Sequence, residues 1–155
     1  MNTNRIGRGT LIGIAALAAV LLLQLSSAAQ QKPVVSVFKS PACGCCSKWV
    51  DHMKANGFEL KVQDVDDISA VKEKLGVAPE ISSCHTSQVG GYVNEGHVPA
   101  AAVQRLLKEK PKVAGLAVPG MPAGSPGMEV PGGHKEPYAI LTFDKSGKTS
   151  VYEKR

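Results

Sequence analysis

The stretch Val34-Val35-Ser36-Val37-Phe38-Lys39-Ser40-Pro41-Ala42-Cys43-Gly44-Cys45-Cys46 decides the fold. Its first five residues are mostly apolar and β-branched, which predicts a buried strand. The following residues predict a turn into a helix that runs from about Cys43 to Asn56 and stops at Gly57. Three of the four cysteines in the chain therefore stand at a strand-to-helix turn, within about one helical turn of roughly 5 Å.

The next part of the chain predicts further strands and helices in alternation. We expect a strand over 58–65, a helix over 67–75, a hairpin that turns at Gly90-Gly91, and a helix from Pro99 to about Lys110. The resulting order, β-α-β-α-β-β-α, predicts an α/β domain of thioredoxin-like type. Its central mixed sheet would be flanked by helices.

The C-terminal part differs in composition. Ten of the nineteen residues from Gly115 to Gly133 are Gly or Pro, which predicts a loop, and this loop contains Met121 and Met128. Segments 138–143 and 149–152 then predict a β-hairpin extension at the C-terminus.

The first residues resemble a secretory signal peptide over 1–29. Arg5 and Arg8 precede an apolar run from Leu11 to Leu23, and small residues follow at 26–29. We expect cleavage after Ala28 or Ala29, which leaves one domain over 30–155 in the periplasm. An uncleaved membrane anchor is the alternative, but the apolar run has only about 13–15 residues where a span needs about 20. Contact with the membrane is thus expected only through the signal peptide.

The charge of the chain does not indicate a nucleic-acid partner. The 18 basic and 13 acidic residues give a net charge of +5, and only 5% of residues are aromatic. The basic residues form no patch interleaved with aromatic side chains, which nucleic-acid binding would favour. Export also places the cysteines in an oxidising compartment.

The cysteine spacing indicates a reactive or metal-binding site. Cys43 and Cys46 form a C-x-x-C pair at a helix N-terminus, where the helix dipole favours the thiolate. Cys45 lies between them and would scramble a disulfide, whereas an additional thiolate suits a soft metal ion. Together with Cys84, the three cysteines therefore predict a metal site. A thiol–disulfide oxidoreductase that uses Cys43 and Cys46 is the alternative.

Copper is the metal that these residues favour. Four cysteines could also close a zinc site, so a zinc-binding module is a further alternative. However, structural zinc sites usually contain two separated C-x-x-C knuckles, and this chain has one. Met121 and Met128 add soft thioether ligands for Cu(I).

The histidines differ in their expected roles. With a turn at Gly90-Gly91, Cys84 lies opposite His97 and on the same face of the sheet, which makes His97 a candidate ligand. His85 follows Cys84 directly and points to the other face unless the chain bends. His52 lies about 10 Å from Cys45 along the helix axis and is expected at the surface. No role is assigned to His134.

Four stretches resemble one bacterial family. They are residues 39–46, Ser83-Cys84-His85-Thr86, residues 91–100 from Gly91 to Ala100, and residues 115–129 with the sequence GLAVPGMPAGSPGME. The family has long been catalogued as a domain of unknown function and includes the CopG-type periplasmic copper-resistance proteins. The resemblance covers essentially all of residues 33–143.

This resemblance implies a thioredoxin-like domain that binds Cu(I) in a small cluster and acts in copper resistance or homeostasis. It implies ligand roles for Cys43, Cys45, Cys46 and Cys84, and extends them to His97, Met121 and Met128. The expected partners are copper ions and other periplasmic copper-handling proteins. Whether the protein only stores copper or is a copper oxidoreductase that cycles Cu(I) and Cu(II) is left open at this point.

Overall fold

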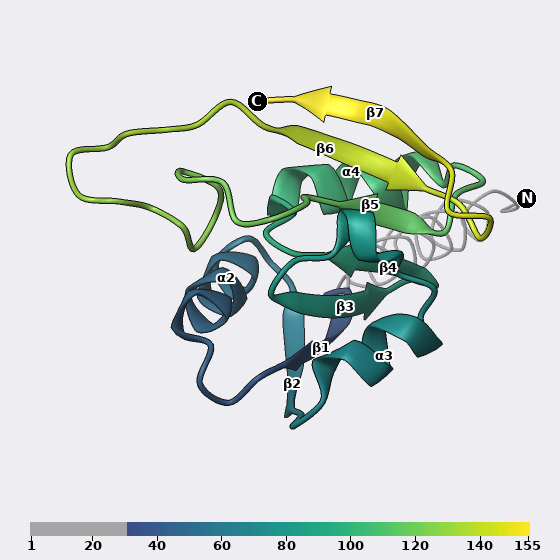
Figure 1. The fold of residues 1–155 in the computed structure, drawn as a ribbon, viewed down its shortest axis with the longest axis horizontal. Helices are drawn as coiled ribbons and strands as arrows, with labels where there is room; N and C mark the ends of the chain where they lie inside the picture. The colour runs from purple at the N-terminus through teal and green to yellow at the C-terminus, as the bar shows by residue number, and fades with distance from the viewer. Residues whose placement is uncertain (1–30) are drawn as a thin grey trace, which may run out of the picture. The chain divides into compact units, whose positions relative to one another are not determined.

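Seven strands in one mixed sheet and three α-helices make up residues 31–155, which are the residues that the computed structural model describes (Figure 1). The predicted signal peptide lies outside them. The elements are β1 (Val34–Lys39), α2 (Gly44–Ala55), β2 (Glu59–Asp64), α3 (Ile68–Lys74), a 3-10 helix (Pro79–Ile81), β3 (His85–Val89), β4 (Tyr92–Glu95), α4 (Ala100–Glu109), β5 (Gly115–Ala117), β6 (Ala139–Phe143) and β7 (Thr149–Lys154). None of the described helices is long and apolar enough to span a membrane.

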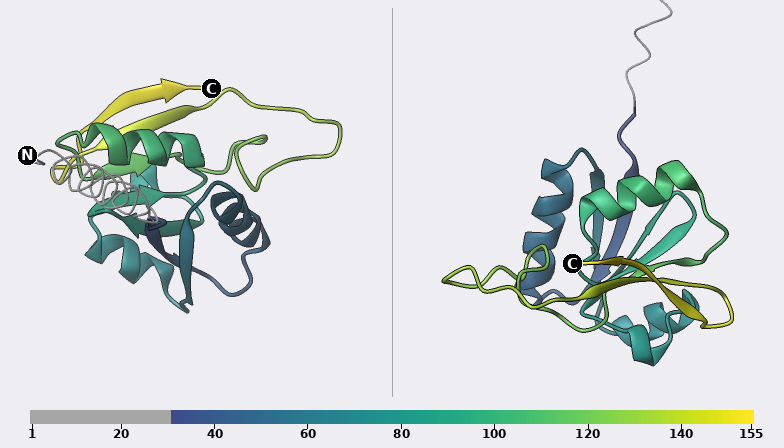
Figure 2. Two further views of the ribbon diagram at one scale, coloured as in Figure 1. Left: turned by 180° about the vertical axis from the view of Figure 1, so that it is seen from behind. Right: turned by 90° about the horizontal axis from the view of Figure 1, so that it is seen from above.

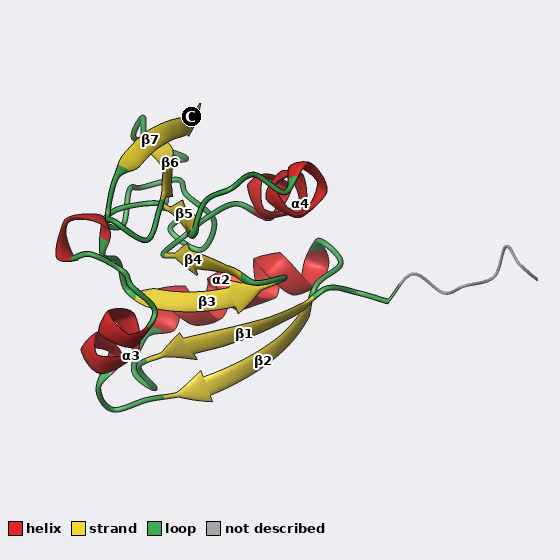
Figure 3. Cartoon of the chain, turned by 90° about the vertical axis from the view of Figure 1, so that its right-hand side faces the viewer, coloured by secondary structure: helices red, strands yellow, loops and turns green. Residues whose placement is uncertain are grey.

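The strand order across the sheet is β2-β1-β3-β4-β5-β6-β7 (Figure 3). β1 pairs with β2 and β4 pairs with β5 in parallel, and the other neighbours are antiparallel. The mixed α/β class predicted from the sequence is therefore confirmed. The C-terminal hairpin, β6 and β7, continues this same sheet through β5.

Helices cover both faces of the sheet (Figure 2). The apolar sides of α2 and α4 pack on one face around Trp49, Met53 and Leu106, all of which are fully buried. Trp49 also donates a hydrogen bond from Nε1 to the Val98 carbonyl at 2.9 Å. On the other face, residues that follow α3, such as Val77 and Ile81, pack against Phe143. The helix that follows the cysteine-bearing turn is thus held by a buried apolar core.

The sequence predicted most of these elements. The buried residues of α2 are Cys46, Trp49, Val50 and Met53, at the helical spacing that predicted this helix. Asp67 caps α3 by accepting from two backbone amides, and α3 lies within the helix predicted over 67–75. The loop prediction over 115–133 was wrong at its start, because β5 is a buried strand there. Gly115 has no side chain that could collide with the Val93 carbonyl, so its strand can lie against β4.

The hairpin of β3 and β4 has the predicted register. Gly90 and Gly91 form the turn with φ of +57° and +86°, and Val89 pairs with Tyr92. The same register continues beyond the paired residues to place Cys84 opposite His97. The hairpin therefore places the side chains of Cys84 and His97 next to each other.

Candidate metal centre

The turn between β1 and α2 places three cysteines together. The amide of Cys43 donates to the Ser40 carbonyl at 3.1 Å, and Cys43 itself is the N-cap of α2. The first turn of the helix then carries Cys45, which is half-buried, and Cys46, which is fully buried. Cys43 and Cys46 are joined by a disulfide, with 5.4 Å between their Cα atoms. The C-x-x-C pair is thus close enough to exchange between dithiol and disulfide.

The fourth cysteine reaches this turn from the other side. The sulfurs of Cys43, Cys45, Cys46 and Cys84 all lie within 4.8 Å of one another, and we call them the four-sulfur group. Cys45 Sγ is 3.5 Å from Cys43 Sγ, and Cys46 Sγ contacts the Cys84 carbonyl at 3.9 Å. The structure therefore brings together the four cysteines that the sequence analysis selected. Their role as metal ligands stays a prediction.

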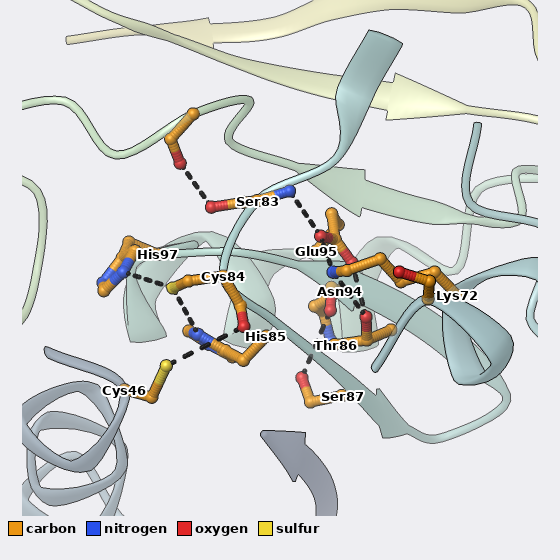
Figure 4. Close-up of polar contacts among 12 residues, drawn as sticks. Cys46, Lys72, Ser83, Cys84, His85, Thr86, Ser87, Asn94, Glu95 and His97 are labelled. Carbon is orange, nitrogen blue, oxygen red and sulfur yellow. Dashed lines mark hydrogen bonds and ion pairs between the residues drawn. The ribbon is translucent and has the colours of Figure 1, made fainter. Parts of the chain in front are cut away.

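Two histidines flank the sulfur of Cys84 (Figure 4). Cys84 Sγ lies 2.9 Å from His97 Nε2 and 3.3 Å from His85 Nδ1, and these three donor atoms lie within 4.8 Å of one another. We call this set of Cys84, His85 and His97 the mixed-donor group. His97 was expected here, whereas His85 was expected only if the chain bends. The chain does bend at Cys84, immediately before β3 begins.

Burial keeps both imidazoles neutral. It lowers the pKa of His85 well below its ordinary value, and neighbouring His97 lowers it further. Burial also lowers the pKa of His97, whose Nδ1 donates to the Pro126 carbonyl at 2.7 Å. That hydrogen bond leaves the lone pair on Nε2, which faces Cys84. Such an outer hydrogen bond is what orients most metal-binding histidines.

The thiol of Cys84 is protonated in the metal-free chain. Burial raises the pKa of Cys84 to about 12, with a further contribution from nearby Cys45. Only the thiolate binds a metal ion, so binding at Cys84 must release this proton. A bound cation would stabilise the Cys84 thiolate, which burial alone disfavours.

The metal-free chain should lose stability as the pH falls from about 7 to about 5. Below about pH 6.5 the unfolded chain protonates histidines that burial keeps neutral in the folded chain, so protons favour unfolding. Burial lowers the pKa values of His52, His85 and His97, so each of them favours the unfolded chain as the pH falls. The limiting contribution of a fully buried histidine such as His85 is about 1.4 kcal/mol per pH unit, and half-buried His52 contributes less because water screens its charge. Urea unfolding of the chelator-treated chain at the two pH values measures this. The decrease in the free energy of unfolding should be smaller in His97→Gln and unchanged in His134→Gln. Equal free energies of unfolding at both pH values would contradict the expectation.

The loop between β5 and β6 reaches the cysteine turn (Figure 1). A side-chain carbon at Gly127 would lie 2.7 Å from the Cys45 carbonyl and 2.8 Å from the Trp49 amide nitrogen, so only glycine allows this approach. Met128 follows directly and is half-buried. Met121 is 52% exposed and follows Gly120, whose carbonyl accepts from the Ser83 hydroxyl. Both methionines thus lie on segments next to the site, and their ligand roles stay predictions.

A buried ion pair that was not predicted from the sequence lies behind Cys84. Lys72 of α3 is paired with Glu95 of β4, which is fully buried and also accepts from the Ser83 amide and the Thr86 hydroxyl, each at 2.6 Å (Figure 4). Ser83 directly precedes the bend. The pair therefore anchors the segment that carries Cys84. No local signal in the sequence indicated it, because Glu95 ends the half-polar strand Tyr92–Glu95 and Lys72 lies among other charged residues of α3.

The other two histidines lie outside both groups. His52 is half-buried, so the expectation of a surface position was wrong: its Nε2 accepts from the Ala100 amide at 3.1 Å and caps the first turn of α4. An imidazole on α2 can do this because the start of α4 packs beside that helix. His134 is exposed in the loop between β5 and β6.

The chain is similar to one catalogued family and to two solved structures. A family described as "Protein of unknown function, DUF411" matches residues 81–128. Two solved structures named "Copper resistance protein copG", Form 2 and Form 1, are each 42% identical to the chain, with TM-scores of 0.76 and 0.75. Each match covers 80% of this chain and 98% of the solved chain. No curated protein sequence matched significantly.

The fold and the site together define a mixed α/β protein with a cysteine- and histidine-rich centre that fits copper handling. At this identity and coverage, the chain belongs to the family of the CopG copper resistance proteins. The resemblance seen in the cysteine motifs is therefore confirmed.

Proposed function

We propose that this protein binds Cu(I) through the four-sulfur group and acts in copper resistance in the periplasm. The observation that carries the proposal is the convergence of four cysteine sulfurs within 4.8 Å at one helix N-terminus. Soft thiolate ligands suit Cu(I), and each cysteine that binds it must release its proton. His97, Met121 and Met128 would complete the ligand shell from β4 and the covering loop.

We further infer that the domain is thioredoxin-like. The element order from β1 to α4 is the one predicted for that fold, and the C-x-x-C pair lies at the first strand-to-helix turn. Export by a cleaved signal peptide over 1–29 belongs to the same proposal. It accounts for an apolar leader before the domain and for a disulfide within it.

Cycling between Cu(I) and Cu(II) is the next part of the proposal. The dithiol of Cys43 and Cys46 can give up two electrons: two Cu(II) ions become two Cu(I) ions, one S–S bond forms, and two thiol protons are released. The disulfide between these cysteines is the oxidised product of that reaction. Cu(I) produced in this way would lie within reach of Cys45 and Cys84, which are both free thiols.

Anaerobic titration of the reduced chain with Cu(I) tests the binding. We expect more than one Cu(I) per chain, in a sulfur-rich shell by X-ray absorption at the copper edge. Cys45→Ser should lower the number of copper ions bound, because it removes a sulfur that lies 3.5 Å from its neighbour in the group. Unaltered copper binding in this variant would count heavily against a cluster, and retention of zinc through purification would favour the zinc alternative.

A thiol–disulfide oxidoreductase is the second candidate, and the Cys43–Cys46 disulfide is the observation that favours it. Such an enzyme should reduce insulin, and its activity should survive Cys45→Ser because the C-x-x-C pair remains. The proposed copper protein needs Cys45 for copper binding. Cys45→Ser should therefore lower the number of copper ions bound if the first candidate is right, and should leave insulin reduction unchanged if the second is right.

A further inference from the structure

A cavity of about 580 Å³ lies beside α3, and no member of either donor group lines it. Its walls come from α3, from the connection that follows α3 and from the 3-10 helix. The lining residues are Ser69, Lys72, Glu73, Val77, Pro79 and Ser82. We propose that this cavity is a docking site for a basic segment of a partner protein, which inserts a lysine or arginine side chain. The inference concerns a protein partner and goes beyond copper binding.

Glu73 gives the cavity its uncompensated charge. It is exposed and forms no ion pair with another residue of the described part of the chain. Lys72 carries the opposite charge, but its ammonium group is already bound to Glu95 and, at 3.1 Å, to the Thr86 hydroxyl. The pair of Lys72 and Glu95 is neutral as a whole, so the cavity attracts a cation and disfavours an anion.

The other lining groups fit the head and the stem of a basic side chain. The amides of Ser69 and Ser82 donate to the Asp67 carboxylate and to the Pro79 carbonyl. Within residues 31–155 the hydroxyls of these two serines have no such partner, and both can accept from an ammonium or guanidinium group. Val77 and Pro79 supply the apolar surface that the methylene stem of a long basic side chain covers.

The surface around the cavity is acidic although the chain as a whole is basic. Residues 59–82 contain six acidic and three basic residues, whereas the rest of residues 31–155 contains seven acidic and thirteen basic ones. Asp66, Asp67 and Glu80 are exposed, and each lies within three residues of a lining residue. A segment with several basic residues is therefore attracted here and repelled elsewhere on the chain. This complementarity favours a basic protein segment over a small free amine.

The cavity adjoins the segment that carries Cys84. Ser82 lines the cavity, and Ser83 follows it directly. The Ser83 amide donates to Glu95, which is the ion-pair partner of Lys72 (Figure 4). Docking would thus place the partner against the residues that lead into the bend before β3.

Fluorescence anisotropy with a labelled basic peptide tests the proposal. The probe is a peptide of repeated Lys-Gly-Gly units, and a peptide with glutamate in place of lysine is its control. We expect the lysine peptide to bind to the metal-free protein and the glutamate peptide not to bind. Salt at about 1 M, where the Debye length is about 3 Å, should release the lysine peptide because the attraction is between exposed charges.

Substitution of Glu73 tests the cavity itself. Glu73→Gln keeps the size of the side chain and removes its charge, so it should weaken peptide binding at least about threefold. Asp51→Asn removes the same charge from an exposed position of α2 and is the matched control, which should bind as the parent does. Both side chains are exposed, so both variants should fold.

Amide chemical shifts in the ¹⁵N-labelled protein locate the bound peptide. The largest changes should fall within residues 69–83 and should be smaller in Glu73→Gln. Failure of the lysine peptide to bind, or equal binding by Glu73→Gln and the parent, would overturn the proposal. Binding of free spermidine as tightly as the peptide would also overturn it, since a protein segment would then have no advantage. Copper is left out of these measurements, so their outcome is separate from that of the copper titration.

Discussion

Replacing Lys72 with methionine should lower the free energy of unfolding by about 3–5 kcal/mol. The ammonium group of Lys72 is paired with the carboxylate of Glu95, and their side chains are only 9% and 0% exposed. Methionine fills the space of the lysine stem but leaves Glu95 as an unpaired charge in the protein interior. The remaining hydrogen bonds to Glu95 come from the Ser83 amide and the Thr86 hydroxyl, and neither carries a charge. Urea unfolding at neutral pH measures the loss.

Two further variants separate this cause from others. Lys74→Met removes an exposed lysine from the same helix and should change stability by less than about 0.5 kcal/mol. Lys72→Met combined with Glu95→Gln should be more stable than Lys72→Met alone, because the amide needs no counter-charge. A cost below about 1 kcal/mol for Lys72→Met would show that the pair is not a source of stability.

The ion pair also shows why part of the site could not be predicted from the sequence. The turn at Gly90-Gly91 defined the register of β3 and β4, and this placed Cys84 opposite His97 correctly. A local signal was sufficient there, because a two-residue hairpin determines every cross-strand pair. His85 depended instead on a bend at Cys84.

That bend is a tertiary feature. The Ser83 amide donates to Glu95, and the Ser83 hydroxyl donates to the Gly120 carbonyl, so contacts from two distant segments hold the chain at this point. No spacing of residues around position 84 encodes these contacts. The same reason applies to His52, which caps a helix that begins 48 residues further along the chain.

A Gly- and Pro-rich composition does not exclude a strand in this chain. The Gly- and Pro-rich stretch from 115 predicted a loop, yet Gly115–Ala117 form β5 in the interior of the sheet. The absence of a side chain at Gly115 permits close approach to β4, and a strand of three residues is too short for periodicity to reveal. This short strand is also what connects the C-terminal hairpin to the rest of the sheet.

Cys84→Ser should have the largest effect on copper of any single substitution at the site. Cys84 is the one residue that belongs to both donor groups, so its loss removes a donor atom from each of them and should weaken Cu(I) binding by the reduced chain. Structural Zn(II) sites of four ligands bind their metal with about 10–16 kcal/mol, or about 3 kcal/mol per ligand. The same contribution from one Cu(I) ligand corresponds to a loss on the order of 100-fold in Cu(I) affinity. Competition with a chromophoric Cu(I) chelator measures this loss of affinity.

Ser47→Ala changes an exposed residue in the first turns of α2 and is the matched control, which should bind Cu(I) like the parent. An affinity for Cu(I) that stays within about threefold of the parent in Cys84→Ser would remove Cys84 from the ligand set, since a lost ligand must cost more than about 1 kcal/mol.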